Sequence, residues 1–452
     1  MKPSETIDRL ILFEAVRKDE TCASLSALLN NALLPNNTEG DATIVSDPGI
    51  FYSVQRALAG NIGKTGFSGT YLQGHIAGII AKEDNVFARM AERGAFDFSQ
   101  NAGPDDESLL VLKLAAREIG LLSALYKFDF KNVFPNLDEY SVANIAGTEA
   151  QNAKLPAPQP LELIHEAMMK GASASGDLTE AAMLLASYYR KYGCGIFGES
   201  QAFSAEEYGL APADRTDPIT MDDLVGCERQ KAALIENIEI MLAGYRANNM
   251  LLYGDSGTGK SSSVKALLNY FAGRGVKLIS VAKDKLTLLP DVFEQIADRG
   301  MKFIIFIDDL SFEDNEYEFK AFKSIIEGRI APRPENAVFI VTTNRKNIVR
   351  DSWADREGQD DVHRRDNMEE KRSLSDRFGI TLTYAAPDKN EYLKIVRSLA
   401  DKAGLMTPAD ELASEAMKWE IRHGGRSGRT ARQFVDYMAG AEAVGGAAGG
   451  KE

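Results

Sequence analysis

GDSGTGKS, at residues 254–261, is the stretch of sequence that decides the fold. It matches the pattern G-x-x-x-x-G-K-[ST], which fixes four residue types at set spacing and forms a phosphate-binding loop where a strand turns into a helix. The apolar run at 250–253 predicts that strand, and apolar residues three and four apart across 264–271 predict the helix. The residues expected to contact a nucleotide here are Gly254, Asp255, Ser256, Gly257, Thr258, Gly259, Lys260, Ser261 and Ser262.

Each residue type in this loop has a chemical reason. Glycines let the backbone curl so that successive N–H groups point at phosphate oxygens, and the helix N-terminus adds partial positive charge. Lys260 is expected to reach the β- and γ-phosphates, and Ser261 offers its hydroxyl to Mg²⁺. A similar stretch at 60–65 also ends in Gly-Lys-Thr, but Leu58 stands where the first glycine is required, so we interpret it as a turn between helices.

A second apolar run, at 303–307, ends in Asp308 and Asp309. A buried strand that delivers carboxylates at its carboxyl end, beside the phosphates, is a Walker B candidate. Asp308 is expected to hold Mg²⁺, and Asp309 to polarise the attacking water. Asp is one methylene shorter than the Glu that many ATPases carry at the second position, so Glu313 is an alternative for that role.

The next apolar strand, at 337–341, leads to Asn344. A side-chain amide at this edge can donate a hydrogen bond to a γ-phosphate oxygen and also orient water. The alternative is an Asx turn that only ends the strand.

Two arginines are candidates for phosphate contact. Arg377 precedes a strand-like run and could act as an arginine finger on the nucleotide of another subunit, with Arg372 as its nearest competitor. Arg429 lies in the first turn of a predicted C-terminal helix, where it could reach a nucleotide held between two domains, and we favour it over Arg426.

The chain is expected to fold as an α/β protein with helical additions. Short apolar runs alternate with helical periods after residue 218, which is typical of βαβ units and a parallel sheet. We expect a mainly helical N-terminal domain for partner recognition at 1–205, a linker at 206–217, an α/β nucleotide-binding core at 218–386, a helical lid at 387–440 and a disordered tail at 441–452.

Composition excludes several classes of protein. No apolar run approaches the roughly 20 residues of a membrane helix, and charges interrupt the start of the chain, so we expect no membrane segment, no signal peptide and a cytoplasmic location. Three widely spaced cysteines suggest neither a disulfide framework nor a zinc site. The net charge of −14 disfavours a general attraction to nucleic acid.

In order along the chain, several motifs together resemble the AAA+ superfamily of ATPases over residues 218–440. They are Val225-Gly226, GDSGTGKS, FIIFIDD, TTNR, SDRFG and SGRTARQF. Three further stretches resemble an uncharacterised prokaryotic family of predicted AAA+ ATPases, a domain of unknown function: YYRKYGCGIFG, IDDLSFE and EEKRSLSDRFG.

The resemblance implies a five-stranded parallel sheet with adenine near Val225 and Gly226. It also implies that Asn344 is sensor 1, Arg377 the finger and Arg429 sensor 2, with sites shared between the subunits of a homo-oligomer. We therefore expect Mg-dependent ATP hydrolysis that remodels a protein partner.

Two other functions remain open. One is a nucleotide-gated switch or scaffold with little turnover. The other is a nucleic-acid loader, in which Lys320, Lys323, Arg329 and Arg333 would line a groove, although a solvated surface is the simpler interpretation of these residues.

Overall fold

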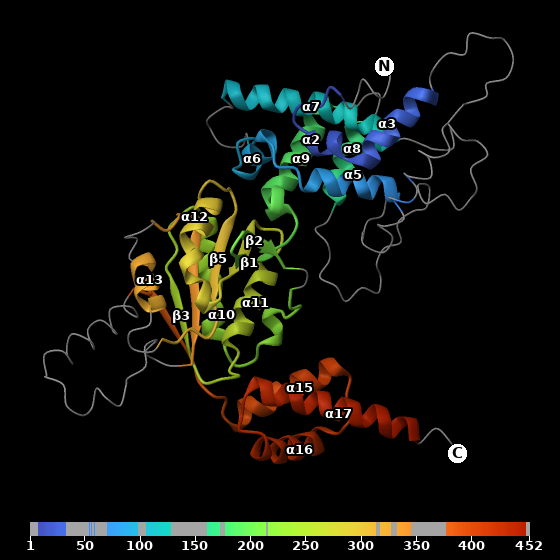
Figure 1. The fold of residues 1–452 in the computed structure, drawn as a ribbon. Helices are drawn as coiled ribbons and strands as arrows, with labels where there is room; N and C mark the ends of the chain where they lie inside the picture. The colour runs from blue at the N-terminus through green and yellow to red at the C-terminus, as the bar shows by residue number, and fades with distance from the viewer. Residues whose placement is uncertain are drawn as a thin grey trace, which may run out of the picture. The chain divides into compact units, whose positions relative to one another are not determined.

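The computed structural model describes residues 8–32, 54, 56, 58, 70–97, 105–127, 161–171, 177–213, 216–312, 317–326, 332–344 and 377–448. The chain divides into two compact units (Figure 1), which are described separately here. Unit 1 comprises Met1–Gln201 with the short segments Gly273–Gly275 and Arg299–Met301, and unit 2 comprises the rest. No helix in the described ranges combines the length and the apolar character needed to cross a membrane.

Unit 1 is helical in its described part. Its helices are α2 (Glu14–Lys18), α3 (Glu20–Ala32), α5 (Tyr71–Ala81), α6 (Val86–Glu92), α7 (Asp106–Tyr126), α8 (Glu162–Gly171), α9 (Leu178–Tyr192) and the short η3 (Gly195–Gly198). Side-chain caps fix several of their starts: Asp105 accepts the N–H of Ser108, and Asp177 accepts those of Thr179 and Glu180. Apolar side chains from all the α-helices of this unit form one buried cluster, so unit 1 has its own core.

Two buried carboxylates hold the start of the described chain inside unit 1. Glu118, which is fully buried, accepts the N–H groups of Ile11, Leu12 and Phe13 at 2.9, 2.9 and 3.2 Å. Glu83 accepts the N–H of Ala15 at 3.2 Å. These bonds satisfy backbone donors just before and within the first turn of α2, where no helical partner exists.

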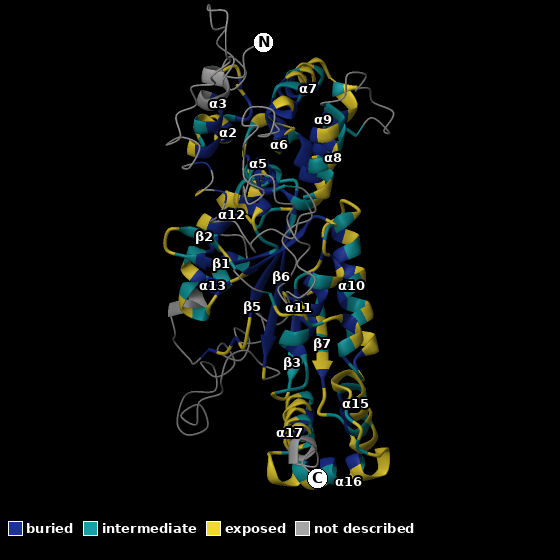
Figure 2. Cartoon of the chain, turned by 90° about the vertical axis from the view of Figure 1, so that its right-hand side faces the viewer, coloured by how far each residue is buried: buried dark blue, intermediate teal, exposed yellow. Residues whose placement is uncertain are grey.

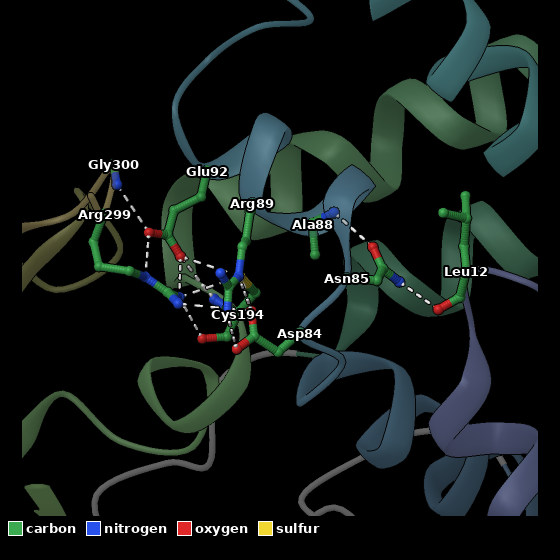
Figure 3. A network of polar contacts seen from close by, with 9 residues as sticks. All are labelled: Leu12, Asp84, Asn85, Ala88, Arg89, Glu92, Cys194, Arg299 and Gly300. Atoms are coloured by element: carbon green, nitrogen blue, oxygen red, sulfur yellow. Dashed lines mark hydrogen bonds and ion pairs between the residues drawn. The ribbon is translucent and has the colours of Figure 1, made fainter. Parts of the chain in front are cut away.

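A third buried carboxylate, Glu92, binds Arg299, Gly300 and Cys194 in the network of polar contacts drawn in Figure 3. Arg299 binds it through two nitrogens, at 2.9 and 2.6 Å, and Gly300 donates its N–H at 2.9 Å. Cys194 donates its N–H to the same carboxylate and accepts a bond from Arg299 on its carbonyl oxygen at 2.7 Å. Removing either charge would leave the other buried without its partner, which is costly. The segment Arg299–Met301 is therefore a fixed part of unit 1.

Unit 2 is built on a seven-stranded sheet with the order β2-β1-β4-β5-β6-β3-β7. The strands are β1 (Ala202–Glu206), β2 (Gly209–Pro212), β3 (Met250–Gly254), β4 (Val276–Ser280), β5 (Lys302–Ile307), β6 (Ala337–Thr343) and β7 (Ile380–Tyr384). Neighbouring strands run parallel except at the β1–β2 pair, which is antiparallel.

The expectation of a five-stranded sheet is wrong, because β1 and β2 extend it at one edge. These two strands form a hairpin from residues that the sequence analysis assigned to the end of the N-terminal domain and to the linker at 206–217. They lack the strong apolar runs of the other five strands, and β2 ends in a proline, which an edge strand tolerates. The buried residues of β1 are Ala202, Phe203 and Ala205, and two of these are too small to give a clear apolar pattern.

Helices cover both faces of the sheet. On one face, α10 (Glu228–Leu242) and α11 (Lys260–Tyr270) pack on side chains such as Leu252, Ile304 and Ile340. On the other, α12 (Leu289–Ala297) and α13 (Tyr317–Ile326) place the rings of Phe293 and Phe322 about 6 Å from Phe339. Strands β5 and β6 are consequently buried along almost their whole length (Figure 2), as α/β sheets require.

Three helices after β7 form a small helical subdomain. They are α15 (Lys389–Ala403), α16 (Ala409–Arg422) and α17 (Gly428–Ala448), with their own apolar cluster. The sequence analysis ended this subdomain at 440 and expected a disordered tail, but α17 continues to Ala448. Alanine is the best helix former, and Glu442 accepts the N–H groups of Met406 and Thr407, so the continuation is anchored.

Glu83 provides a test of the packing in unit 1. Burial raises the pKa of its carboxyl to about 7. Between about pH 4.3 and that value the folded protein binds more protons than the unfolded one, so this group lowers stability as the pH rises. Glu83→Gln keeps an acceptor for Ala15 but does not ionise. We expect it to be more stable than the natural protein at pH 8 by about 1–2 kcal/mol, and equal to it below about pH 4.

Urea unfolding followed by circular dichroism at several pH values measures this difference. A gap between the two proteins that stays constant with pH would contradict the assignment.

Candidate functional site

The glycine-rich loop joins β3 to α11 at the carboxyl edge of the sheet. Gly254, Gly257 and Gly259 have φ angles of 150°, 78° and 98°, in the region that favours glycine. A side chain on Gly254 would also lie 1.9 Å from the carbonyl oxygen of Tyr384 on the neighbouring β7. The strand pairing and the curl of the loop therefore both require glycine at this position.

Lys260 opens α11 and folds back over the loop. Its Nζ donates to the carbonyl oxygens of Gly254 and Asp255, both at 2.7 Å, and to Oδ1 of Asn344 at 2.9 Å. Burial lowers the pKa of Lys260, and the charges of Asp309 and Asp308 partly counteract that effect. A buried ammonium group is thus held between the loop and the end of β6.

Asp308, directly after β5, is held by two hydroxyl groups. Ser261 donates to its Oδ1 at 2.6 Å, and Thr342, near the end of β6, donates to the same oxygen at 2.5 Å. Since Ser261 belongs to α11, this one carboxylate joins the loop helix to two neighbouring strands. Hydroxyl and carboxylate oxygens are the ligands that Mg²⁺ prefers.

Asp309 stands in an unusual backbone conformation. Its φ of 52° makes it the one non-glycine residue with positive φ in the described ranges. Asp and Asn tolerate this conformation better than most residues. Its N–H donates to Oγ1 of Thr342 at 2.8 Å, and its Oδ1 accepts from Nδ2 of Asn344 at 2.6 Å. Asn344 therefore bridges Lys260 and Asp309.

These groups border a cavity of about 650 Å³ in unit 2. Of the residues that the sequence analysis selected, its lining contains Val225, Gly226, Ser256, Gly257, Thr258, Gly259, Lys260, Ser261, Ser262, Asp308, Asp309, Asn344 and Arg429. Gly254 and Asp255 belong to the loop through their carbonyl bonds to Lys260 but do not border the cavity. The lining is partly apolar and also includes Pro387, Ile395 and Leu399.

The helical subdomain contacts the loop directly. Gly428, the first residue of α17, donates its N–H to the carbonyl oxygen of Gly257 at 3.0 Å, and the neighbouring Arg429 borders the cavity. The charge of Arg429 contributes to the lowered pKa of Lys260, after the larger effect of burial and the opposing carboxylates. Arg426 instead donates to the buried Glu420 at 3.1 Å and does not border the cavity.

Arg377 is exposed and does not border this cavity. A residue that acts on the nucleotide of another subunit need not border the cavity of its own subunit. Glu313, Arg372, Arg329 and the glycine-rich turn at 60–65 lie outside the described residues.

The sequence analysis missed several residues of the site. Thr342 is buried and contacts both aspartates; the TTNR motif includes it, but the sequence analysis assigns it no role. Asp223, in the short helix η4 (Met221–Asp223), forms an ion pair with Lys402 of α15. Burial acts to raise the pKa of Asp223, but hydrogen bonds from Lys402 and Thr220 outweigh it and lower that pKa to about 2.

Comparison with known proteins finds one matching family and a number of similar solved structures. A family described as "Protein of unknown function (DUF815)" matches residues 198–442, more than half of the 452 residues. No curated protein sequence matches the chain.

Two of the solved structures to which the chain is similar are the following. The Thermotoga maritima RuvB Holliday junction branch migration motor has 18% identity and a TM-score of 0.36. It matches over 50% of this chain and 66% of its own length, just under two thirds. A chain of the E. coli MS115-1 HORMA:CdnC:Trip13 complex has 16% identity and a TM-score of 0.34, over 48% of this chain and 90% of its own.

Gly254→Ala tests the close contact between the loop and β7. The new methyl group would collide with the carbonyl oxygen of Tyr384, so we expect a loss of more than about 3 kcal/mol in the free energy of unfolding. Gly404→Ala is the matched control: φ is 68° there but no atom lies within 4 Å, so about 1 kcal/mol is expected. Urea unfolding measures both losses. If the two variants lose equal free energy of unfolding, the contact with Tyr384 is not the reason for glycine at position 254.

Proposed function

The chain belongs to the family of proteins of unknown function DUF815, and we propose that it is an ATPase of the AAA+ type that binds and hydrolyses ATP with Mg²⁺. The observation that carries the proposal is the meeting of Lys260, Ser261, Asp308, Asp309 and Asn344 around one cavity at the carboxyl edge of a parallel sheet. These groups supply a phosphate-binding cation, oxygen ligands for a metal, a carboxylate for water and an amide for the γ-phosphate.

The donor set fits Mg²⁺. Oγ of Ser261 and Oδ1 of Asp308 lie 2.6 Å apart, so both oxygens could bind one cation once the hydroxyl hydrogen turns away from the carboxylate. Mg²⁺ binds few protein oxygens and keeps several waters, which suits a site with one hydroxyl and one carboxylate. Once bound beside the phosphates, the ion would neutralise part of their charge.

Lys260 accounts for phosphate binding. Its ammonium group now donates to two loop carbonyls and to Asn344, and phosphate oxygens are stronger partners because they are charged. The N–H groups at the start of α11 face the same region. The β- and γ-phosphates of ATP would therefore draw Lys260 away from the carbonyl oxygens of Gly254 and Asp255.

Asp309 is the residue that we assign to water activation, with Glu313 as the alternative. Two bonds fix Asp309: its N–H to Thr342, and its carboxylate to Asn344. Its left-handed backbone offers a reason for aspartate here, because glutamate adopts positive φ less readily. Asn344 would exchange its contacts with Lys260 and Asp309 for the γ-phosphate and the attacking water.

The remaining roles concern the base and the neighbouring subunit. We assign the adenine to the part of the cavity near Val225, Gly226 and the apolar side chains of α15, and Arg429 to the phosphates. Arg377 would act on the nucleotide of a neighbouring subunit in a homo-oligomer. Turnover would then move α15–α17 relative to the sheet and remodel a protein partner bound by the N-terminal region.

The two other functions differ in what supports them. A nucleotide-gated switch would use the same cavity with little turnover. A nucleic-acid loader has less support, because Arg333 is engaged within unit 2: it donates to Asn249 and to the carbonyl oxygen of Ala247. Arg333 is half-buried, and this burial, with the charge of Arg246, lowers its pKa to about 10.

Lys260→Ala tests the site assignment. Loss of the phosphate-binding cation should reduce ATP turnover by about 10²–10³-fold, measured as phosphate release by the full-length protein. Lys418→Ala is the control, because Lys418 lies in α16 in an exposed ion pair with Glu415, and its turnover should be unchanged. Unchanged turnover in Lys260→Ala would refute the assignment. ATP binding with negligible turnover in the natural protein would favour the switch.

Thr342 provides a second test, of metal positioning. Thr342→Val keeps the shape of the side chain but removes the hydroxyl that holds Asp308 and accepts from Asp309. The Mg²⁺ concentration for half-maximal turnover should rise about 10-fold, as for other groups that orient a metal ligand. Thr342→Ser keeps the hydroxyl and should stay within about 3-fold of the natural protein. If Val and Ser behave alike, the hydroxyl has no such role.

A further inference from the structure

Unit 1 contains a group of three side chains whose chemistry the nucleotide site does not use. Asp19, Cys22 and His75 each offer one ligand atom, and these three atoms lie within 4.8 Å of one another. We propose that they form a binding site for a divalent transition-metal ion of the zinc type. The proposal is independent of the ATPase assignment, because these residues belong to unit 1 and the nucleotide cavity to unit 2.

Local structure explains why the three residues meet. Asp19 directly precedes α3, and its Oδ1 accepts the N–H of Cys22 at 2.9 Å, as a helix-capping carboxylate does. This bond keeps the side chain of Cys22 next to the carboxylate. His75, on α5, places its Nε2 3.0 Å from the same Oδ1. Two helices and one capping residue therefore fix the positions of all three ligands.

The donor set selects the class of metal. One thiolate, one imidazole and one carboxylate are ligands that Zn²⁺ and similar ions accept, whereas Mg²⁺ and Ca²⁺ prefer oxygen alone. With Cys22 and Asp19 ionised and His75 neutral, two negative charges would balance the charge of a divalent cation. Three protein ligands leave a fourth position for water in a tetrahedral site.

Burial at the group is uneven, which suits the entry of a cation. Cys22 is fully buried, while the side chains of Asp19 and His75 retain 23% and 17% of their exposure. An ion could therefore reach the thiol from the side of the carboxylate and the imidazole. The buried sulfur would in turn be shielded from oxidation by other solutes.

A simpler function for the same contacts is structural: Asp19 caps α3 and accepts a hydrogen bond from His75. Burial, followed by the Asp19 charge, raises the pKa of the Cys22 thiol well above its usual range, so the thiol is protonated in the metal-free protein. A bound cation would replace that proton. The two functions differ in whether a metal–thiolate bond can form, and this can be observed directly.

Co²⁺ is the probe for the experiment, because it substitutes for Zn²⁺ and absorbs light. Metal-free, full-length protein without nucleotide is titrated with Co²⁺. We expect one equivalent to produce a near-ultraviolet thiolate-to-cobalt band together with visible bands of a four-coordinate ion. Co²⁺ at the oxygen ligands Ser261 and Asp308 would give no thiolate band, so the two sites are distinguishable.

Variants identify the ligands. Cys22→Ser should abolish the thiolate band, and His75→Gln should weaken Co²⁺ binding by more than about 10-fold while keeping the thiol. Cys227→Ser, which changes a buried thiol in unit 2, should leave the band unchanged. Circular dichroism of each variant checks that it folds. Whether a metal–thiolate bond forms at all is decided by the Co²⁺ titration of the natural protein, which does not depend on any variant.

Two results would overturn the proposal. One is the absence of any thiolate band in the natural protein with Co²⁺ in about 10-fold excess, at a protein concentration in the micromolar range where structural metal sites are filled. The other is a band that persists in Cys22→Ser, which would assign the metal to another thiol.

Discussion

The carboxylate of Asp308, held by the hydroxyls of Ser261 and Thr342, is the interaction on which the rest of unit 2 depends. It joins the first turn of α11 to the ends of β5 and β6, so the glycine-rich loop keeps a fixed position relative to the sheet. Asp309 adds a second negative charge beside it, and Lys260 supplies the nearby cation. Two carboxylates and one ammonium group therefore meet beside the same cavity at the carboxyl edge of the sheet.

The sequence predicts most of unit 2 because its signals are local. Five strands are short apolar runs that alternate with helical periods, and the loop residues fall in one pattern. Both can therefore be inferred without knowing what lies across the sheet. The β1–β2 hairpin escapes prediction because two of its buried residues, Ala202 and Ala205, are small and give no clear apolar run. The end of α17 is not predicted either, because a sequence rich in alanine and glycine resembles a disordered tail. The tertiary bonds that Glu442 accepts from Met406 and Thr407 hold it in place.

Side chains that act through tertiary contacts are the other part that sequence alone does not reveal. Thr342 matters through two bonds to residues more than 30 positions earlier in the chain, so the TTNR motif that contains it does not reveal its role. Cys22 and Asp19 are near in sequence, but His75 comes 56 residues after Asp19, so no spacing rule connects them. Arg429 differs from both, because its position in the first turn of a predicted helix is a local signal. The structure places it beside the cavity.

The way the chain is divided between the two units has a consequence for protein engineering. Gln201, Gly275 and Met301 are the last residues of three segments of unit 1, and β1, β4 and β5 begin at the residues that follow them. A truncated protein that starts at residue 202 would keep Arg299 but lose Glu92 and Cys194, which satisfy its buried guanidinium. Deleting the N-terminal region is therefore not equivalent to removing an independent module, and a loss of activity after such a deletion would not by itself identify a partner-binding role.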